Sequence, residues 1–274
     1  MIFGSAAAHY ETHIIPAFRP FARAVIDTAR PQGNELTLDV GTGTGILARE
    51  IAPQVERVIG VDVASQMVEQ ARAATRREGL TNVGFQEADA HDLPFPAGHF
   101  DMVVASFGFN ATRPSKAFPE VARVLRSGGV LAFHEWGLQH ELDSALIDVL
   151  VNFMVDDDDA DDDLIRVREF VAAPCPWHNT FQNTEDFAEE LAAYGFSQVE
   201  AWEDSPVTCA LPVADFMAYK LAWPNRRAEL NAMPDFQRAD CIDALRRVFQ
   251  EFADRDGNIR YQPSLFRVRA LASG

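Results

Sequence analysis

Residues 36–46 read LTLDVGTGTGI and join a short apolar run to three closely spaced glycines and the start of a helical pattern. Glycine lets a backbone turn tightly and lets a ligand approach the main chain. The helix after such a loop presents free N–H groups and the positive end of its dipole, which attract carboxylate or phosphate groups. The segment therefore predicts a strand, a ligand-binding loop and a helix.

Apolar runs alternate with helical patterns over residues 34–136. The apolar runs are residues 36–40, 58–61, 83–86, 102–105 and 130–133. Between them, residues 46–52, 65–78 and 115–125 place apolar side chains at helical spacing. This alternation indicates βαβ units and a parallel sheet. Residues 198–202 and 265–270 read as two further strands, and residues 181–196 as a helix capped by Asn183 or Thr184.

The spacing of the glycines narrows the choice of ligand. A dinucleotide fingerprint requires G-x-G-x-x-G/A, but the third residue after Gly43 is Ile46. The pattern present is D-x-G-x-G-x-G, beginning at Asp39. Asp62 ends the second predicted strand, where a carboxylate suits the recognition of ribose hydroxyls. A nicotinamide-dependent oxidoreductase is therefore disfavoured.

Four ordered motifs carry a family resemblance. They are LDVGTGTG (38–45), GVDVASQMVEQAR (60–72), FQEADAHDLPFPAGHFDMVVASFGF (85–109) and VARVLRSGGVLAFHEW (121–136). Together they resemble the class I S-adenosylmethionine-dependent methyltransferases. Within that class, Ser106-Phe107-Gly108 and Glu135 are similar to the quinone-biosynthesis C-methyltransferases and their small-molecule relatives. Asn110-Ala111 differs from the Arg-Asn of the quinone enzymes, so the acceptor stays open.

The resemblance implies an α/β, Rossmann-like methyltransferase fold. We expect a seven-stranded, mostly parallel sheet with helices on both faces and a helical cap. Residues 1–274 would form a single methyltransferase domain. Residues 1–30 and 206–260 would form the cap over the substrate site, because their apolar helical faces need a partner surface.

The resemblance also implies a site for S-adenosylmethionine, with S-adenosylhomocysteine as product. The glycines would face the methionine end, Asp39 its amino group, and Asp62 both ribose hydroxyls. The full set of expected cofactor-binding residues is Asp39, Gly41, Gly43, Gly45, Asp62, Val63, Met67, Asp89, Ala90, Ser106 and Phe107. Two alternatives remain: Asp39 as a turn or cap residue, and Met67 as a core residue.

Three residues are candidates for catalysis. His134 and Glu135 follow the fifth predicted strand, at the edge where open α/β sheets bind ligands. One of them should face the cleft, because neighbours on a strand point to opposite faces. Tyr10 lies where relatives fold an aromatic ring over the cofactor. Structural hydrogen bonds or plain packing are the alternatives, and a base is needed only when the nucleophile arrives protonated.

Composition excludes several classes of partner. The chain has 274 residues, 24 Lys+Arg and 41 Asp+Glu, and a formal net charge of −17. Such a charge repels nucleic acid and anionic lipid alike. The three cysteines have no zinc or disulfide spacing, so we expect free thiols and no metal. We also expect a cytoplasmic protein with neither signal peptide nor membrane helix. The aspartate-rich run 156–163 reads as a solvated, mobile loop rather than a calcium site.

The family resemblance implies methyl transfer from S-adenosylmethionine to a small organic acceptor by in-line displacement. A cofactor-binding protein of the same fold without turnover is one alternative, and a quinone-type C-methyltransferase is another. The sequence leaves the acceptor atom and a homo-oligomeric state open. A nucleic-acid methyltransferase is disfavoured because ASFGF (105–109) lacks the acid-Pro-Pro-aromatic motif of amino-methylating enzymes.

Overall fold

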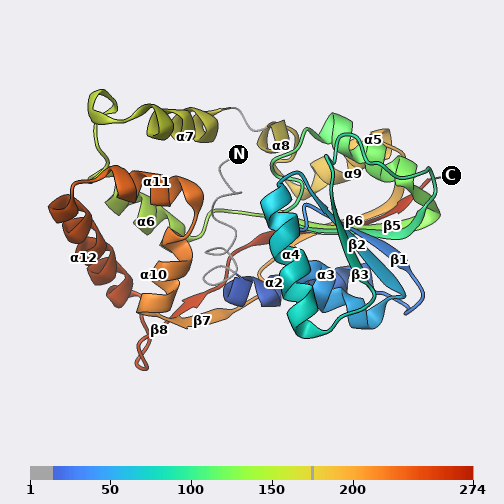
Figure 1. Ribbon diagram of the computed structural model, residues 1–274, viewed down its shortest axis with the longest axis horizontal. Coiled ribbons are helices and arrows are strands. Elements are labelled where there is room, and N and C mark those ends of the chain that lie inside the picture. The colour runs from blue at the N-terminus through green and yellow to red at the C-terminus, as the bar shows by residue number, and fades with distance from the viewer. Residues whose placement is uncertain (1–14, 174–175, 274) are drawn as a thin grey trace.

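A seven-stranded sheet forms the larger lobe of the molecule (Figure 1). The computed structural model describes residues 15–173 and 176–273. The strand order is β3-β2-β1-β4-β5-β9-β6, and only β9 runs antiparallel to its neighbours. The strands are β1 (Leu36–Val40), β2 (Arg57–Asp62), β3 (Val83–Glu87), β4 (Phe100–Ser106), β5 (Leu125–Trp136), β6 (Phe196–Asp204) and β9 (Leu265–Ala272). The prediction of a seven-stranded, mostly parallel sheet is confirmed.

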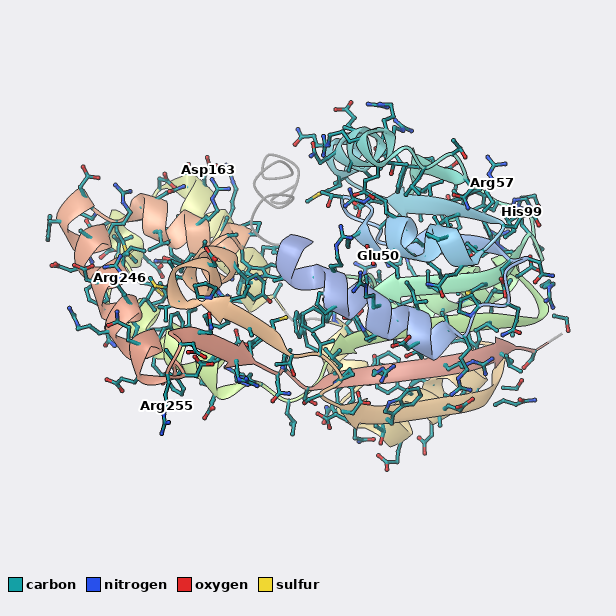
Figure 2. All side chains as sticks on the ribbon, turned by 90° about the horizontal axis from the view of Figure 1, so that it is seen from below. Glu50, Arg57, His99, Asp163, Arg246 and Arg255 are labelled. Carbon is teal, nitrogen blue, oxygen red and sulfur yellow. The ribbon has the colours of Figure 1, made fainter. Side chains whose placement is uncertain are left out.

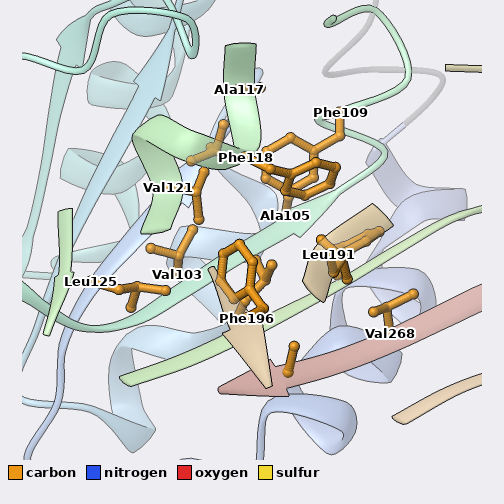
Figure 3. Packing of buried hydrophobic residues seen from close by; sticks show 14 of the residues in the cluster. Val103, Ala105, Phe109, Ala117, Phe118, Val121, Leu125, Leu191, Phe196 and Val268 are labelled. Atoms are coloured by element: carbon orange, nitrogen blue, oxygen red, sulfur yellow. The ribbon is translucent and has the colours of Figure 1, made fainter. Parts of the chain in front are cut away.

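Helices cover both faces of this sheet. One face carries α2 (Ile15–Ala29), α3 (Ile46–Ile51) with its 3-10 turn Ala52–Gln54, and α4 (Ser65–Glu78). The other carries α5 (Pro114–Val124), α8 (Pro176–Thr180) and α9 (Thr184–Ala193). Figure 3 shows the second face, where Phe118 and Val121 of α5 pack over Val103 and Ala105 of β4. Asn183 caps α9 with a reciprocal capping box, as its sequence predicts.

A second lobe, mostly helical, lies beside the sheet (Figure 1). It consists of α6 (Glu141–Val151), α7 (Asp162–Ala172), α10 (Val213–Leu221), α11 (Pro224–Ala232), α12 (Asp235–Glu251), and a ribbon of β7 (Cys209–Pro212) and β8 (Asn258–Tyr261). The expectation that residues 206–260 are mostly helical misses this ribbon. Cys209 and Tyr261 pair at one end of it, 52 residues apart in the chain, so no local pattern reveals the pairing.

Helix α2 belongs to both lobes. Its Ala22, Val25 and Ile26 are buried against the sheet and α3, so this part of the helix packs on the sheet, and the expected cap over a substrate stays a prediction. Only its first turns, with Phe18 and Phe21, join the core of the helical lobe. A helix with two apolar stripes can serve two cores at once. Residues 1–14, which include Tyr10, lie outside the described residues.

The aspartate-rich run is exposed, as expected of a solvated segment, but it contains a 3-10 turn and the start of a helix. Asp157–Asp159 form a 3-10 turn, and the Asp161 side chain accepts a hydrogen bond from Leu164 N as the cap of α7. Arg168 of α7 binds Glu229 of α11 through both carboxylate oxygens, at 2.8 and 2.6 Å, and also contacts Asp157. The arginine therefore offsets the repulsion among the aspartates and fastens α7 to α11.

Charged side chains cover the outside of both lobes, as Arg57, Asp163 and Arg246 illustrate (Figure 2). Within residues 15–173 and 176–273, no helix has the length and apolar character needed to cross a bilayer. The same residues contain no cluster of His, Cys, Asp and Glu suited to a metal ion.

Candidate functional site

A narrow pocket opens at the carboxyl ends of β1 and β4. It is lined by Phe18, Asp39, Gly41, Thr42, Gly43, Thr44, Ile46, Leu47 and Ser106. Ligands of open α/β sheets bind at this edge, where loops diverge from the strand ends. A larger cavity lies at the opposite edge, lined in part by Arg30, Arg126 and Arg269. Those arginines pair with Glu200 and Asp101, so we place the functional site at the glycine loop.

The three glycines of the loop differ in what surrounds them. Gly41, Gly43 and Gly45 all have positive φ, at 68°, 54° and 84°. A Cβ on Gly41 would lie 2.6 Å from Gly108 Cα, and one on Gly45 would lie 2.8 Å from the Phe85 ring. A Cβ on Gly43 would meet nothing within 4 Å. Gly41 and Gly45 therefore allow the loop to pack closely, and Gly43 borders open space; Gly41 and Gly43 both line the pocket, and the expected contact of the three glycines with a ligand stays a prediction.

Asp39 forms the floor of the pocket. Its Oδ2 accepts hydrogen bonds from Thr42 Oγ1 at 2.6 Å and from Ala48 N at 3.1 Å. Burial raises the pKa of this carboxyl to about 7, despite those two hydrogen bonds. Asp39 thus holds the glycine loop and also lines the pocket, so its turn role does not exclude the expected contact with a ligand.

Asp62 lies at the end of β2, beside the glycine loop. Its Oδ2 accepts a hydrogen bond from Gly43 N, and its Oδ1 accepts one from Ala64 N, both at 2.9 Å. Burial raises its pKa. Each carboxylate oxygen keeps a further lone pair, so Asp62 can accept bonds from a ligand as well. The carboxylate therefore links the loop after β1 to the end of β2.

Four further residues of the expected cofactor-binding set divide into buried and exposed ones. Met67 is 4% exposed and packs with Ala64, which fits the core alternative. Val63 is 53% exposed and Asp89 is also exposed, while Ala90 packs partly against the core. The Asp89 carboxylate accepts a hydrogen bond from the backbone N–H of His91 at 2.9 Å, and the same oxygen lies 2.9 Å from Nδ1 of the His91 ring. These residues lie outside the narrow pocket of the glycine loop.

Ser106 and His134 face each other at the ends of β4 and β5. They are register partners, and Ser106 Oγ lies 2.9 Å from His134 Nε2. The His134 ring is completely buried, and burial lowers its pKa to about 3, with a smaller effect of the Arg267 charge. Phe107 follows with a φ of 57° and stacks on Trp136, with ring centroids 4.1 Å apart. His134 therefore lies behind Ser106 rather than on the pocket wall.

Glu135 points to the opposite face of the sheet. Its Oε1 accepts hydrogen bonds from Phe109 N at 3.0 Å and Asn110 N at 3.1 Å. Burial raises its pKa to about 8. The alternation predicted for His134 and Glu135 holds, but the geometry corrects the expected catalytic place of Glu135. Its carboxyl anchors the loop after β4, which positions Phe107 and Gly108.

Sequence reasoning missed two features of the site. Phe18 lines the pocket, although it was expected only as part of a cap helix, and its ring lies 5.3 Å from Phe107 and 6.1 Å from Trp223. Gly108 presses on the end of β1, since a Cβ there would lie 2.1 Å from Val40 O. The amphipathic spacing of α2 was the available signal for Phe18, whereas Gly108 entered the sequence analysis only as part of the Ser106-Phe107-Gly108 resemblance, which says nothing about its contact with β1.

The polar groups at the pocket and beside it match the chemistry of the amino-acid and ribose parts of a nucleoside cofactor. The buried Thr44 Oγ1, which lines it, has no hydrogen-bond partner among the described residues. Gly43 leaves open space beside the carboxylates of Asp39 and Asp62. An ammonium group would favour the ionised form of Asp39, and hydroxyl groups would donate to Asp62.

Comparison with known proteins agrees with this geometry. Residues 38–133 match the sequence family described as a methyltransferase domain. The demethylmenaquinone methyltransferase of Thermus thermophilus is 44% identical over 118 residues, which are 42% of this chain and 53% of that protein. The nocamycin O-methyltransferase of Saccharothrix syringae is 31% identical over 172 residues, which are 55% of this chain and 58% of that protein. The chain thus spans about half the length of these curated relatives.

A solved structure extends the similarity beyond the matched segment. The YcgJ protein of Bacillus subtilis superposes with a TM-score of 0.58 and 20% sequence identity, covering 93% of this chain and 98% of that chain. At this identity the likeness concerns the fold alone. It supports the arrangement of sheet and helices over nearly the whole chain.

Proposed function

We propose, from the premise that residues 38–133 are a methyltransferase domain of the class I fold, that this protein transfers a methyl group from S-adenosylmethionine to a small organic acceptor. The observation that carries the proposal is the pocket at the glycine loop, where Gly43 leaves space beside Asp39 and Ser106. That space lies next to Asp62, whose carboxylate borders the same loop.

The chain's own residues would hold and orient the cofactor. Asp39 would bind its ammonium group and Asp62 its ribose hydroxyls, while Met67, Asp89 and Ala90 would border the adenine. S-adenosylmethionine, when bound, supplies a methyl group on a positively charged sulfur. Because that group is already activated, alignment and water exclusion remain the main tasks of the protein. The packed rings of Phe18, Phe107 and Trp136 suit water exclusion.

The helical lobe next to the pocket is where we expect the acceptor molecule to bind. Phe18 and Phe107 belong to an aromatic cluster that continues into Tyr219 and Trp223 of the helical lobe. This supports an uncharged or weakly polar acceptor held by residues 206–260 and the first turns of α2. The net charge of −17 supports a small molecule rather than nucleic acid or an anionic membrane surface. The free thiols of Cys209 and Cys241 support a cytoplasmic location, because thiols stay reduced there.

A quinone-type C-methyltransferase is a second candidate. The aromatic cluster would suit a planar ring, and the matched Thermus protein is named for a demethylmenaquinone substrate. Asn110-Ala111 counts against it, because the quinone enzymes carry Arg-Asn at these positions.

Two measurements test the proposed function. Calorimetry with S-adenosylhomocysteine should show binding, and Asp62→Ala should weaken it by more than about tenfold, because two hydrogen bonds to a charged group are lost. Asp240→Ala, at an exposed position of α12, is the matched control and should bind normally. Incubation with methyl-labelled cofactor and a pool of aromatic metabolites should yield a labelled product. Binding without any product would favour the cofactor-binding protein instead, and no binding would contradict both.

A further inference from the structure

Three polar residues form a row across neighbouring strands beneath α2. Ser106 of β4 pairs in register with His134 of β5, and His134 pairs with Arg267 of β9. Arg267 is held by Ala24 O at 3.0 Å, by Thr28 Oγ1 at 2.8 Å and by an ion pair with Asp204 at 3.1 Å. The guanidinium is therefore a fixed positive charge on the side of His134 away from Ser106.

The imidazole between them is buried and neutral. Its Nε2 lies 2.9 Å from Ser106 Oγ, while its Nδ1 has no hydrogen-bond partner among the described residues. The rings of Phe107 and Phe21 cover it at centroid distances of 4.4 and 6.3 Å. Burial and the charge of Arg267 both lower its pKa, so the ring stays neutral across the physiological range.

A neutral imidazole has one donor and one acceptor nitrogen. A proton on Nδ1 would be a buried donor without a partner. Buried orphan donors are rarer than under-satisfied acceptors. The favoured tautomer therefore carries its proton on Nε2, and that N–H donates to Ser106 Oγ.

We infer that His134 is a positioning residue rather than a proton acceptor: its Nε2–H donates to Ser106 Oγ, so that the Ser106 hydroxyl turns its own hydrogen into the pocket, toward a carboxylate oxygen of the bound cofactor. Ser106 lines the pocket together with Asp39. A carboxylate accepting from Ser106 and an ammonium group beside Asp39 would together fix an amino-acid end. The inference rests on the proposed function, because it takes S-adenosylmethionine as the ligand.

The test is a double-mutant cycle read by calorimetry with S-adenosylhomocysteine, which keeps the amino-acid end of the cofactor. Ser106→Ala should weaken binding about tenfold, the size expected for a hydrogen bond to a charged group. His134→Phe, which removes the donor but keeps a ring, should weaken it at least about threefold. His134→Gln, which restores an N–H donor, should recover most of this loss. In the Ser106→Ala background, His134→Phe should have no further effect.

Other outcomes would overturn the inference. Equal affinity of wild type and His134→Phe, or additive effects in the cycle, would show that His134 does not act through Ser106. If the turnover rate of wild type changes with pH near neutrality and this change is absent in His134→Gln, His134 would be the proton acceptor instead. If His134→Phe does not fold, His134→Leu replaces it in the cycle, and the affinities of Ser106→Ala and His134→Gln still test the inference. The matched control is His99→Phe, because His99 is an exposed histidine away from the pocket (Figure 2). A wild type that does not bind S-adenosylhomocysteine would instead contradict the proposed function.

Discussion

Gly41, Gly43 and Gly45 share a left-handed backbone, yet a side chain at each position would meet different surroundings. A methyl group on Gly41 would strike the backbone of Gly108, which cannot move aside because Gly108 itself presses on Val40. A methyl group on Gly43 would point into open space beside the pocket. At the scale of single residues, a loop motif therefore combines positions whose lack of a side chain the fold requires with one, Gly43, where the fold leaves room for a side chain.

Substitutions at these two glycines should separate stability from binding. Gly43→Val should fold but lose binding of S-adenosylhomocysteine, because the branched side chain would occupy ligand space, at a backbone cost of about 1–2 kcal/mol. Gly41→Ala should lower the free energy of unfolding by more than Gly43→Val does, since it adds a clash with backbone. Denaturant unfolding and calorimetry on both variants check this. Normal cofactor affinity in Gly43→Val would contradict the assignment of the pocket.

At the scale of elements, strand β5 divides its polar residues between the two faces of the sheet. His134 serves the face under α2, and Glu135 anchors the loop after β4 on the other face. The Oε2 atom of Glu135 is buried and has no hydrogen-bond partner among the described residues. Charging this carboxyl in the folded protein is therefore costly, which is why its pKa is raised to about 8.

Glu135 should make the folded state less stable as the pH rises. Its carboxyl is protonated below a pKa of about 8 in the folded protein but only below its ordinary value when unfolded, so stability falls through this window. Asp39, with a pKa of about 7, acts in the same direction. In Glu135→Gln the fall should be smaller, so the stability of the variant relative to wild type should increase between about pH 5 and pH 8.

Thermal and denaturant unfolding across this pH range measure that difference. The exposed Glu251→Gln, at the end of α12, serves as the control and should leave the pH dependence as in wild type. Parallel curves for Glu135→Gln and wild type would show that Glu135 is already ionised at neutral pH in the folded protein.

At the scale of the whole molecule, two lobes with separate cores meet at α2 and along β9. The helical lobe has an ionic group in its core: Lys220 Nζ lies 2.6 Å from Asp143 Oδ1 and 3.7 Å from the centre of the Tyr261 ring. Tyr261 donates its hydroxyl hydrogen to Asp143 Oδ2 at 2.9 Å. Burial lowers the pKa of Lys220 to about 8, although Asp143 opposes this effect. Lys220, Asp143 and Tyr261 together connect α10, α6 and β8 within the helical lobe.

Asp143→Ala should destabilise the protein by about 3 kcal/mol at pH 6, because it leaves a buried ammonium group without its carboxylate. Without Asp143 the pKa of Lys220 falls further. As the pH rises from about 6 to 8, Lys220 in the folded variant therefore loses a proton that it still holds in folded wild type. The unfolded variant then binds more protons than the folded variant, so its stability deficit relative to wild type narrows. Denaturant unfolding of both proteins at these pH values measures the deficit, with the exposed Asp215→Ala on α10 as control. A deficit that does not depend on pH would show that Lys220 is not the group responsible.

The amino-acid sequence by itself determined the sheet and the cofactor loop. Helix α4 begins and ends at the predicted Ser65 and Glu78, because its apolar spacing and the glycine that follows are local signals. Asp39, Gly43 and Asp62 could be assigned to one site because the carboxyl ends of parallel strands meet at one edge. Such features depend on spacing within a few residues or on a fixed rule of topology.

The tertiary structure alone decided the protonation and partners of the polar groups. Glu135 was open to a catalytic or a structural role until the N–H groups of Phe109 and Asn110 were seen at its carboxylate. Lys220 and Asp143 lie 77 residues apart, and Arg168 and Glu229 lie 61 apart, with no local pattern to connect them. Burial sets the cost of each charge, and burial arises only when distant elements pack. The residue types were therefore readable from the chain, whereas their charge states and roles followed from the fold.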